Sequence, residues 1–377
     1  ILALSVMAVC GQASAHVYEK GDTGWKEAES YTGWFDPSQR SETFSDGSST
    51  VDITSGNIST NKEFALLAFN QGTINVIDTN INISSIRDGA ANAVGATTVS
   101  RFEKNAEGKN VLTAFTDGGT INIGKAGVTQ NINISAKSTN SDAIGIRTMR
   151  SVNDPDKANG IYATPSFVNI EGENLNINAH SDKGYAVGIW AQNNTGEKGN
   201  ESTVNINAKN TVIDVTTGIT EADASGEYLN IGVVAYSGAK VYLNNNVTIN
   251  AGTAISTRGG SVIEINKNGN GTVKINGDIN FNYDKPTSGT AVDATVNINL
   301  NNKDSFLNGN IFVNGNPFPP SGKDKVSAMT LGLSNGATWN TDADSFVNNL
   351  NLNGGVINLK GDENQTITVD KSISGSG

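Results

Sequence analysis

Short segments in which apolar and polar residues alternate recur along the chain from about residue 50 onward. In most of them an Asn stands between two β-branched residues, and Gly, Asn or Asp bounds the segment. Clear examples are INISS from Ile81, NINISA from Asn131, LNINA from Leu175 and VNINL from Val296. A period of two is typical of β-strands, and no stretch shows a helical period. The pattern therefore predicts an all-β chain.

A longer unit repeats on top of this alternation. It consists of an apolar strand that ends in a small residue, a corner that contains Gly, and a second strand in which polar and apolar residues alternate. The copies are ALLAFNQGTINV from Ala65, VLTAFTDGGTINI from Val111, IGVVAYSGAKVYL from Ile231, AISTRGGSVIEI from Ala254, AIGIRT from Ala143 resuming at Phe167, and AVGIWAQ from Ala186 resuming at Thr203. Internal repetition of this kind is typical of a solenoid.

The corners favour a coil over a sandwich. Gly and Asn adopt positive φ at low cost, which suits corners of variable length, whereas a sandwich would show hairpin turns between longer matched strands. Asn stacked on Asn also forms amide ladders along a coil. We predict a right-handed parallel β-helix (solenoid) over residues 51–377, with roughly fourteen turns of about 20 to 25 residues and C-terminal turns from about 326. An Asn-rich pair of sandwiches is the alternative.

Residues 16–50 differ from the repeats because they lack Asn and are rich in aromatic residues, including Trp25 and Trp34. The open end of a coil exposes unpaired strand edges and needs a cap. We therefore expect an N-terminal cap here; an aromatic binding tip is the alternative.

The first fifteen residues have the character of an export signal. An apolar run from Ile1 to Val9 precedes Ala13-Ser14-Ala15, the small-x-small pattern that a signal peptidase cleaves. We expect a partial signal peptide over residues 1–15, with Ala13 and Ala15 at the cleavage site. The run is too short to span a bilayer; a buried helix and a lipoprotein anchored at Cys10 are the alternatives. Cleavage would leave a mature chain without Cys, although an exported protein can form disulfides.

Charge and composition narrow the function. The net charge of -11 would repel phosphate backbones, so we expect no nucleic-acid partner. Two His residues and one Cys leave little material for a zinc site or a thiol enzyme.

The C-terminal part carries a family resemblance. LGLSNGATWN from Leu331, SFVNNLNL from Ser345 and GGVINL from Gly354 resemble the passenger domains of autotransporters, the type V secreted proteins of Gram-negative bacteria. The resemblance implies that these segments form the last turns of the β-helix, ahead of a membrane-embedded β-barrel. No barrel sequence follows, so we expect the sequence to be a fragment truncated at both ends. It also implies export to the cell surface or outer membrane, or an extracellular location, with membrane attachment only through the absent barrel.

Catalytic motifs are not evident. Parallel β-helices include pectate lyases and polygalacturonases, so the fold alone does not exclude an enzyme. Asn340-Thr341-Asp342 matches one hydrolase strand by letters only, no Asp-Asp pair occurs, and His180 lies in Ala-His-Ser rather than Gly-His-Gly. No nucleophile elbow is present. We therefore expect no catalytic residue, metal or cofactor.

Two features are candidates for ligand binding. Insertions at about 149–165 and 192–203 leave the coil where loops can carry function, or are tolerated surface insertions. Aromatic residues recur beside the small residue that closes a strand, and form either an exposed stripe for stacking on sugars or part of the core. The candidate residues are Arg147, Arg150, Asp154, Asp156, Lys157, Phe69, Phe115, Trp190 and Tyr236.

The hypothesis that best fits these observations is a non-catalytic surface adhesin or self-association rod. Its partners would be a glycan or protein on a host or bacterial surface, or a second copy of the chain. A polysaccharide-active lyase or glycosidase and a passive stalk are the alternatives.

Overall fold

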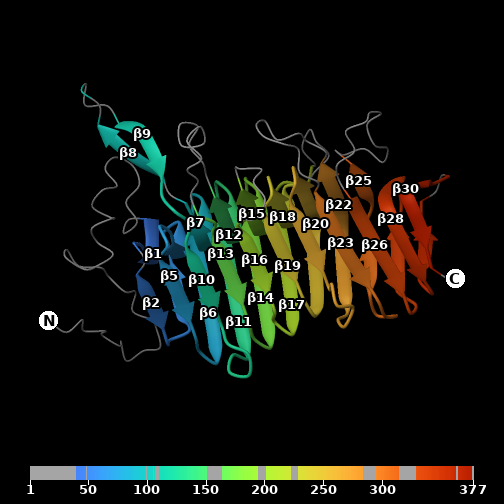
Figure 1. Ribbon diagram of the computed structural model, residues 1–377, viewed down its shortest axis with the longest axis horizontal. Coiled ribbons are helices and arrows are strands. Elements are labelled where there is room, and N and C mark those ends of the chain that lie inside the picture. Colours follow the sequence, from blue (N-terminus) through green and yellow to red (C-terminus); the bar gives the residue numbers. More distant parts are fainter. Residues whose placement is uncertain are drawn as a thin grey trace.

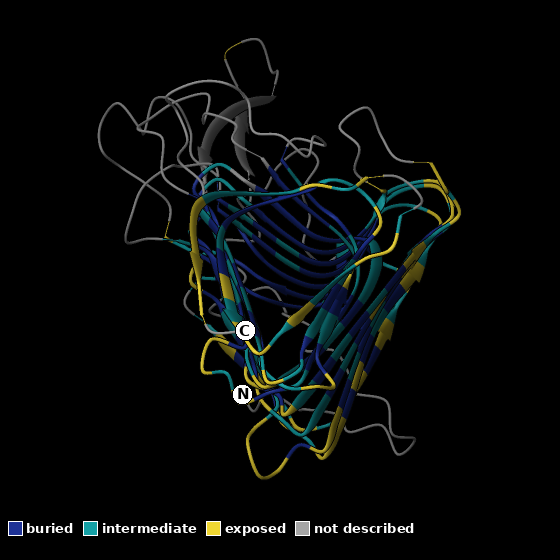
Figure 2. Cartoon of the chain, turned by 90° about the vertical axis from the view of Figure 1, so that its right-hand side faces the viewer, coloured by how far each residue is buried: buried dark blue, intermediate teal, exposed yellow. Residues whose placement is uncertain are grey.

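The protein is seen in a computed structural model that describes residues 40–47, 49–98, 100–104, 106, 110–150, 164–193, 201–221, 228–282, 294–313, 328–361 and 364–375. The described elements are strands wound into a coil with three flat sides, which we call faces 1, 2 and 3 (Figures 1 and 2). No helix among these residues is long and apolar enough to cross a bilayer.

Faces 1 and 2 belong to one sheet of 17 strands, because two long strands run through both faces. These are β20 (Asn246–Arg258) and β22 (Val273–Asn282). The other strands of face 1 are β1 (Ser41–Ser45), β4 (Phe64–Ala68), β7 (Ala91–Thr97), β12 (Ala143–Arg150), β15 (Ala186–Asn193), β18 (Asn230–Tyr236) and β25 (Ile311–Val313). The other strands of face 2 are β3 (Asn57–Thr60), β6 (Asn80–Arg87), β11 (Asn131–Ser138), β14 (Asn174–Ser181), β17 (Asn210–Thr217), β24 (Phe306–Asn308), β27 (Thr338–Thr341) and β29 (Val356–Leu359).

Face 3 is a separate sheet of 11 strands. It consists of β2 (Thr50–Ile53), β5 (Thr73–Val76), β10 (Thr120–Ile123), β13 (Phe167–Ile170), β16 (Thr203–Ile206), β19 (Lys240–Leu243), β21 (Val262–Ile265), β23 (Thr295–Leu300), β26 (Ala328–Ser334), β28 (Ser345–Asn353) and β30 (Ile367–Ser374). Among the described residues, face 3 therefore has fewer strands than the roughly fourteen turns predicted, because several turns are longer than 25 residues, as from Thr73 to Thr120.

Neighbouring turns pair in parallel, which confirms the predicted β-helix and excludes the sandwich. On face 3, Ile121 lies in register with Ile74 of the preceding turn and Val168 of the next. All three side chains are fully buried. The alternation therefore has a simple origin: β-branched residues point into a dry interior and stack on their equivalents, while the Asn residues between them point outward.

The predictions fail at one repeat. The segment from Val111 resembles a coil strand, yet β9 (Asn110–Phe115) pairs antiparallel with β8 (Ser100–Lys104) in a hairpin that leaves the coil. The face 1 strand of that turn is β7 instead. Strands of the coil also begin at Ser41, ahead of the boundary that we expected at residue 51. The expected signal peptide with Ala13 and Ala15, and residues 16–39 of the expected cap, lie outside the described residues.

Candidate functional site

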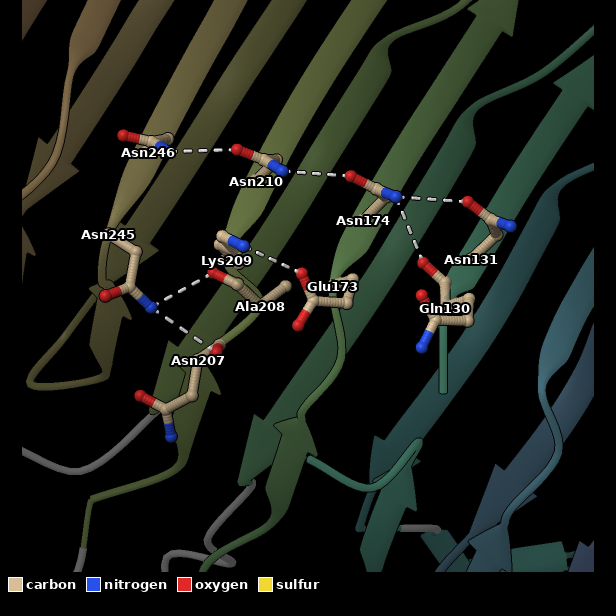
Figure 3. Close-up of polar contacts among 10 residues, drawn as sticks. All are labelled: Gln130, Asn131, Glu173, Asn174, Asn207, Ala208, Lys209, Asn210, Asn245 and Asn246. Carbon is tan, nitrogen blue, oxygen red and sulfur yellow. Dashed lines mark hydrogen bonds and ion pairs between the residues drawn. The ribbon is translucent and has the colours of Figure 1, made fainter. Parts of the chain in front are cut away.

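Rows of hydrogen-bonded Asn side chains follow the coil on its outer surface. In each row the Nδ2 of one Asn donates to the Oδ1 of its equivalent in the preceding turn, as the sequence predicts. On face 2 the first row, which we call ladder one, has donor to acceptor distances from 2.8 to 3.2 Å (Figure 3). It consists of Asn80, Asn131, Asn174, Asn210 and Asn246.

A second row on the same face, ladder two, begins at a carboxylate. The Nδ2 of Asn250 donates to Oδ1 of Asp214 at 2.5 Å, and the bonds that follow measure 2.6 to 2.8 Å. It continues through Asn276, Asn308, Asn340 and Asn358. Because every amide donates toward the N-terminus, an acceptor without an N–H group suits the first position of a row.

Between the two ladders lies a groove of about 630 Å³. It is lined by Asn210, Thr211, Val212, Asn246, Thr248, Thr272, Lys274, Lys303, Asp304 and Phe306. Register pairs Val212 with Thr248, Thr248 with Lys274, and Lys274 with Phe306, so one row of the lining crosses four successive turns. At about 4.8 Å per turn the groove runs about 14 Å along the coil.

The corners of the coil shape one side of this groove. Asn245 has a positive φ of 65°, and its Nδ2 donates to the carbonyls of Asn207 and Ala208 (Figure 3). Gly271 packs directly against Asn245, since a Cβ there would lie 1.9 Å from the Asn245 carbonyl oxygen. Only Gly fits this contact. The corner therefore brings Thr272 to Asn246, whose Oδ1 accepts the Thr272 backbone N–H at 2.8 Å and ends ladder one inside the groove.

A polar turn holds the charged residues at the other end of the groove. The Oδ1 of Asn302 accepts hydrogen bonds from the backbone N–H of Asp304 at 3.0 Å and from Oγ of Ser305 at 3.1 Å. Its Nδ2 donates to Oγ1 of Thr272 at 3.1 Å. These bonds fix the backbone of the turn and leave the side chains of Lys303 and Asp304 exposed.

The charges in the groove are unpaired. Within the part of the chain that the structure describes, the side chains of Lys274, Lys303 and Asp304 make no ion pair or hydrogen bond. Lys274 is half-buried. By contrast, Lys209, just outside the groove, contacts Glu173 with an Nζ to Oε2 distance of 3.1 Å (Figure 3). The groove thus offers cations, amides, hydroxyls and one aromatic ring to a ligand.

The predicted aromatic stripe does not exist as a single row. Phe69 is fully buried and packs on Phe44 with ring centroids 6.5 Å apart, so its proposed ligand contact was wrong. Trp190 and Tyr236 lie on the outside of face 1 and meet edge to face, with centroids 5.4 Å apart. They pack on a small apolar cluster that includes Val187. The side chain of Phe115 is outside the described residues.

The two arginine candidates, Arg147 and Arg150, differ in their exposure. Arg147 pairs in register with Trp190 on face 1 and is only partly exposed. Burial lowers the pKa of its guanidinium from the ordinary value, and the nearby carboxylate of Glu63 opposes that change. Arg150 is 1% exposed, so the prediction that it binds a ligand was wrong.

Asp154, Asp156 and Lys157 lie outside the described residues, as do residues 151–163 and 194–200 of the two insertions. Sequence reasoning missed the groove altogether. Its only signal is the replacement of an outward Asn by Val212, Thr248, Lys274 and Phe306 in successive turns, which becomes visible once the register is known.

Comparison with known proteins does not assign the chain to a family. The chain matches no protein-family model, no curated protein and no solved structure. Among the described residues, no group of three or more His, Cys, Asp or Glu side chains is placed to hold a metal ion.

Proposed function

We propose that this chain is a surface-displayed adhesin: a non-catalytic rod, exported by the autotransporter route, that binds a linear polymer along its side. The observation that carries the proposal is the groove on face 2, which runs parallel to the coil and crosses four turns. Amide and hydroxyl groups with one aromatic ring are the chemistry that binds sugars, and a groove parallel to the coil suits a chain rather than a compact ligand.

The construction of the coil supports export by this route. Each turn contacts mainly its neighbours, so the chain can fold turn by turn as it emerges from a membrane. The region after the expected signal peptide has no Cys, and hence no disulfide that would prevent threading. The resemblance of the segments from Leu331 to Leu359 to autotransporter passengers points the same way. These segments form β26 to β29, which precede β30 at the C-terminal side of the described coil.

A variant whose groove is blocked by a large side chain tests the adhesin proposal. Thr248→Trp places a large side chain in the groove, whereas Thr295→Trp makes the same change at an outward position on face 3. Both variants are displayed on a bacterium that carries the chain fused to a membrane barrel, and adhesion to immobilised glycans and to cultured cells is counted. We expect Thr248→Trp to lose adhesion and Thr295→Trp to keep it. Equal adhesion of the two variants would exclude the groove as the binding site.

One observation favours an enzyme as the second candidate. Asp304 and the two lysines line the same groove. In a β-elimination on a uronic-acid polymer, one lysine amine would remove the proton beside the carboxylate and the other would neutralise that carboxylate. The electron pair would then form a C=C bond and expel the glycosidic oxygen, which takes up a proton from water. Incubation with polygalacturonate tests this, because the unsaturated product absorbs ultraviolet light; Lys274→Gln would abolish that absorbance.

A further inference from the structure

We infer that the groove between the two ladders selects a linear polysaccharide that carries carboxylates, and that the sugar chain lies parallel to the coil. This inference rests on the proposed function and names the ligand class of the same site. It begins from charge: the whole chain has a net charge of -11, yet the groove holds two ammonium groups that no carboxylate pairs within the described residues.

Other lysines on the coil show that pairing is readily available. Lys62, Lys209, Lys240 and Lys267 each contact a Glu side chain at 3.0 to 3.7 Å. Among the described residues, Lys274 has no such partner although it is half-buried beside Thr248 and Phe306, its register neighbours. An unpaired cation in a partly desolvated groove gains from an anionic ligand, because the interaction is less screened there than on an open surface.

The uncharged part of the groove fits a sugar chain. An amide has two N–H groups, and Asn210 and Asn246, the two ladder-one residues that line the groove, each use one of them along the ladder, which leaves the other for a ligand hydroxyl. The shorter side chains of Val212 and Thr248 replace the Asn of earlier turns and leave room above the sheet. Phe306 adds an aromatic side chain to the lining, in register with Lys274. Turns repeat at about 4.8 Å, close to the separation of successive sugars in an extended chain.

Asp304 provides a second test, because removing its charge should change ligand affinity in the opposite direction to removing a lysine charge. Its exposed carboxylate shares the groove with the lysines and would repel a ligand carboxylate. Removing a lysine charge should therefore weaken binding, while removing the Asp304 charge should strengthen it. A site that merely needs an intact shape would not respond in this way.

The test uses the purified full chain and three polymers: polygalacturonate, its fully methyl-esterified form and dextran sulfate. Binding is measured by titration calorimetry at low salt. We expect the chain to bind polygalacturonate, with an affinity that falls as salt is added, and to bind the neutral ester much more weakly. Lys274→Gln should lower the affinity about tenfold, and Asp304→Asn should raise it about threefold.

The matched control is Lys137→Gln on β11, because Lys137 is exposed, lies outside the groove and makes no ion pair within the described part of the chain. This variant should bind like the unmodified chain, and circular dichroism checks that each variant keeps its β-structure. Equal binding of the ester, or no change in Lys274→Gln, would overturn the inference. Equal binding of dextran sulfate would overturn its assignment to carboxylates.

The two proposals can fail separately. If displayed cells adhere in a groove-dependent manner but the purified chain ignores polygalacturonate, the ligand class is wrong and the adhesin proposal stands. If the purified chain binds polygalacturonate through Lys274 but displayed cells adhere to no surface, the adhesin proposal is wrong and the ligand class stands.

Discussion

The direction of the Asn ladders leads to a test of how they stabilise the coil. On face 3 the Nδ2 of Asn122 donates to Oδ1 of Asn75 at 2.8 Å, and the Oδ1 of Asn122 accepts from Asn169 at 2.9 Å. At the start of this row, Asp52 accepts from Asn75 at 2.8 Å. Asp and Asn have the same shape but differ in their donors. Exchanging them at two positions of one row therefore isolates the direction of the hydrogen bonds.

The expected magnitudes follow from what each exchange removes. Asn122→Asp loses one hydrogen bond, about 1 kcal/mol net, and sets a carboxylate oxygen against the Oδ1 of Asn75. Its bond from Asn169 becomes charge-assisted, which offsets part of the loss. We expect a cost of about 1 to 2 kcal/mol in the free energy of unfolding. Asp52→Asn keeps an acceptor for Asn75 and should cost less than about 0.5 kcal/mol.

Urea unfolding and amide hydrogen exchange together provide the assay. Hydrogen exchange is needed because a coil whose turns contact mainly their neighbours can open locally without global unfolding. In Asn122→Asp, exchange should accelerate around β5, β10 and β13, while Asp52→Asn should leave those strands protected. If the two exchanges cost the same, or if Asn122→Asp costs nothing, the ladders do not stabilise the coil through directed hydrogen bonds.

Three further outcomes are expected. Burial raises the pKa of Asp278 above its ordinary value of 3.8, so ionising this carboxyl costs more in the folded chain than in the unfolded one. The free energy of unfolding therefore falls as pH rises from about 4 through the raised pKa. Asp278→Asn should be more stable than the unmodified chain in urea unfolding at pH 7, and this difference in stability should vanish near pH 4. Gly188→Ala should lower the free energy of unfolding by about 1 to 3 kcal/mol in the same assay, because the new Cβ would lie 2.4 Å from Cγ2 of Ile213. An unchanged urea midpoint would show that the interior can accommodate the added methyl group. Trp339→Ala should cost about 3 to 5 kcal/mol, since this fully buried ring also donates to the carbonyl of Gly309 at 3.0 Å; a loss under about 1 kcal/mol would contradict the packing.

The sequence predicted the parallel coil and its amide ladders because both follow from local alternation. It could not predict which strands are equivalent, because equivalence depends on register across distant turns. Phe69 and Trp190 both stand beside a small residue in the sequence, yet Phe69 lies in the interior just after β4, while Trp190 lies within β15 and pairs with Arg147 on the outside. The hairpin strand Asn110–Phe115 is as apolar in sequence as a coil strand, yet it pairs antiparallel with β8. The groove was missed because its lining, too, is brought together only by the register of distant turns.

In these strands, ligand binding and folding depend on different residues: the outward ones line the groove, and the inward ones form the core. Beneath the groove, Ile213, Ile249, Ile275 and Leu307 stack in register and are fully buried. The outward positions beside them change from apolar to hydroxyl, cation and aromatic ring while this inner row keeps its aliphatic character. Since inner side chains carry most of the burial, outward changes can alter ligand chemistry at little cost in stability. Groove variants such as Lys274→Gln should therefore change affinity and leave the unfolding midpoint almost unmoved, which is why affinity and stability have to be measured on the same preparations.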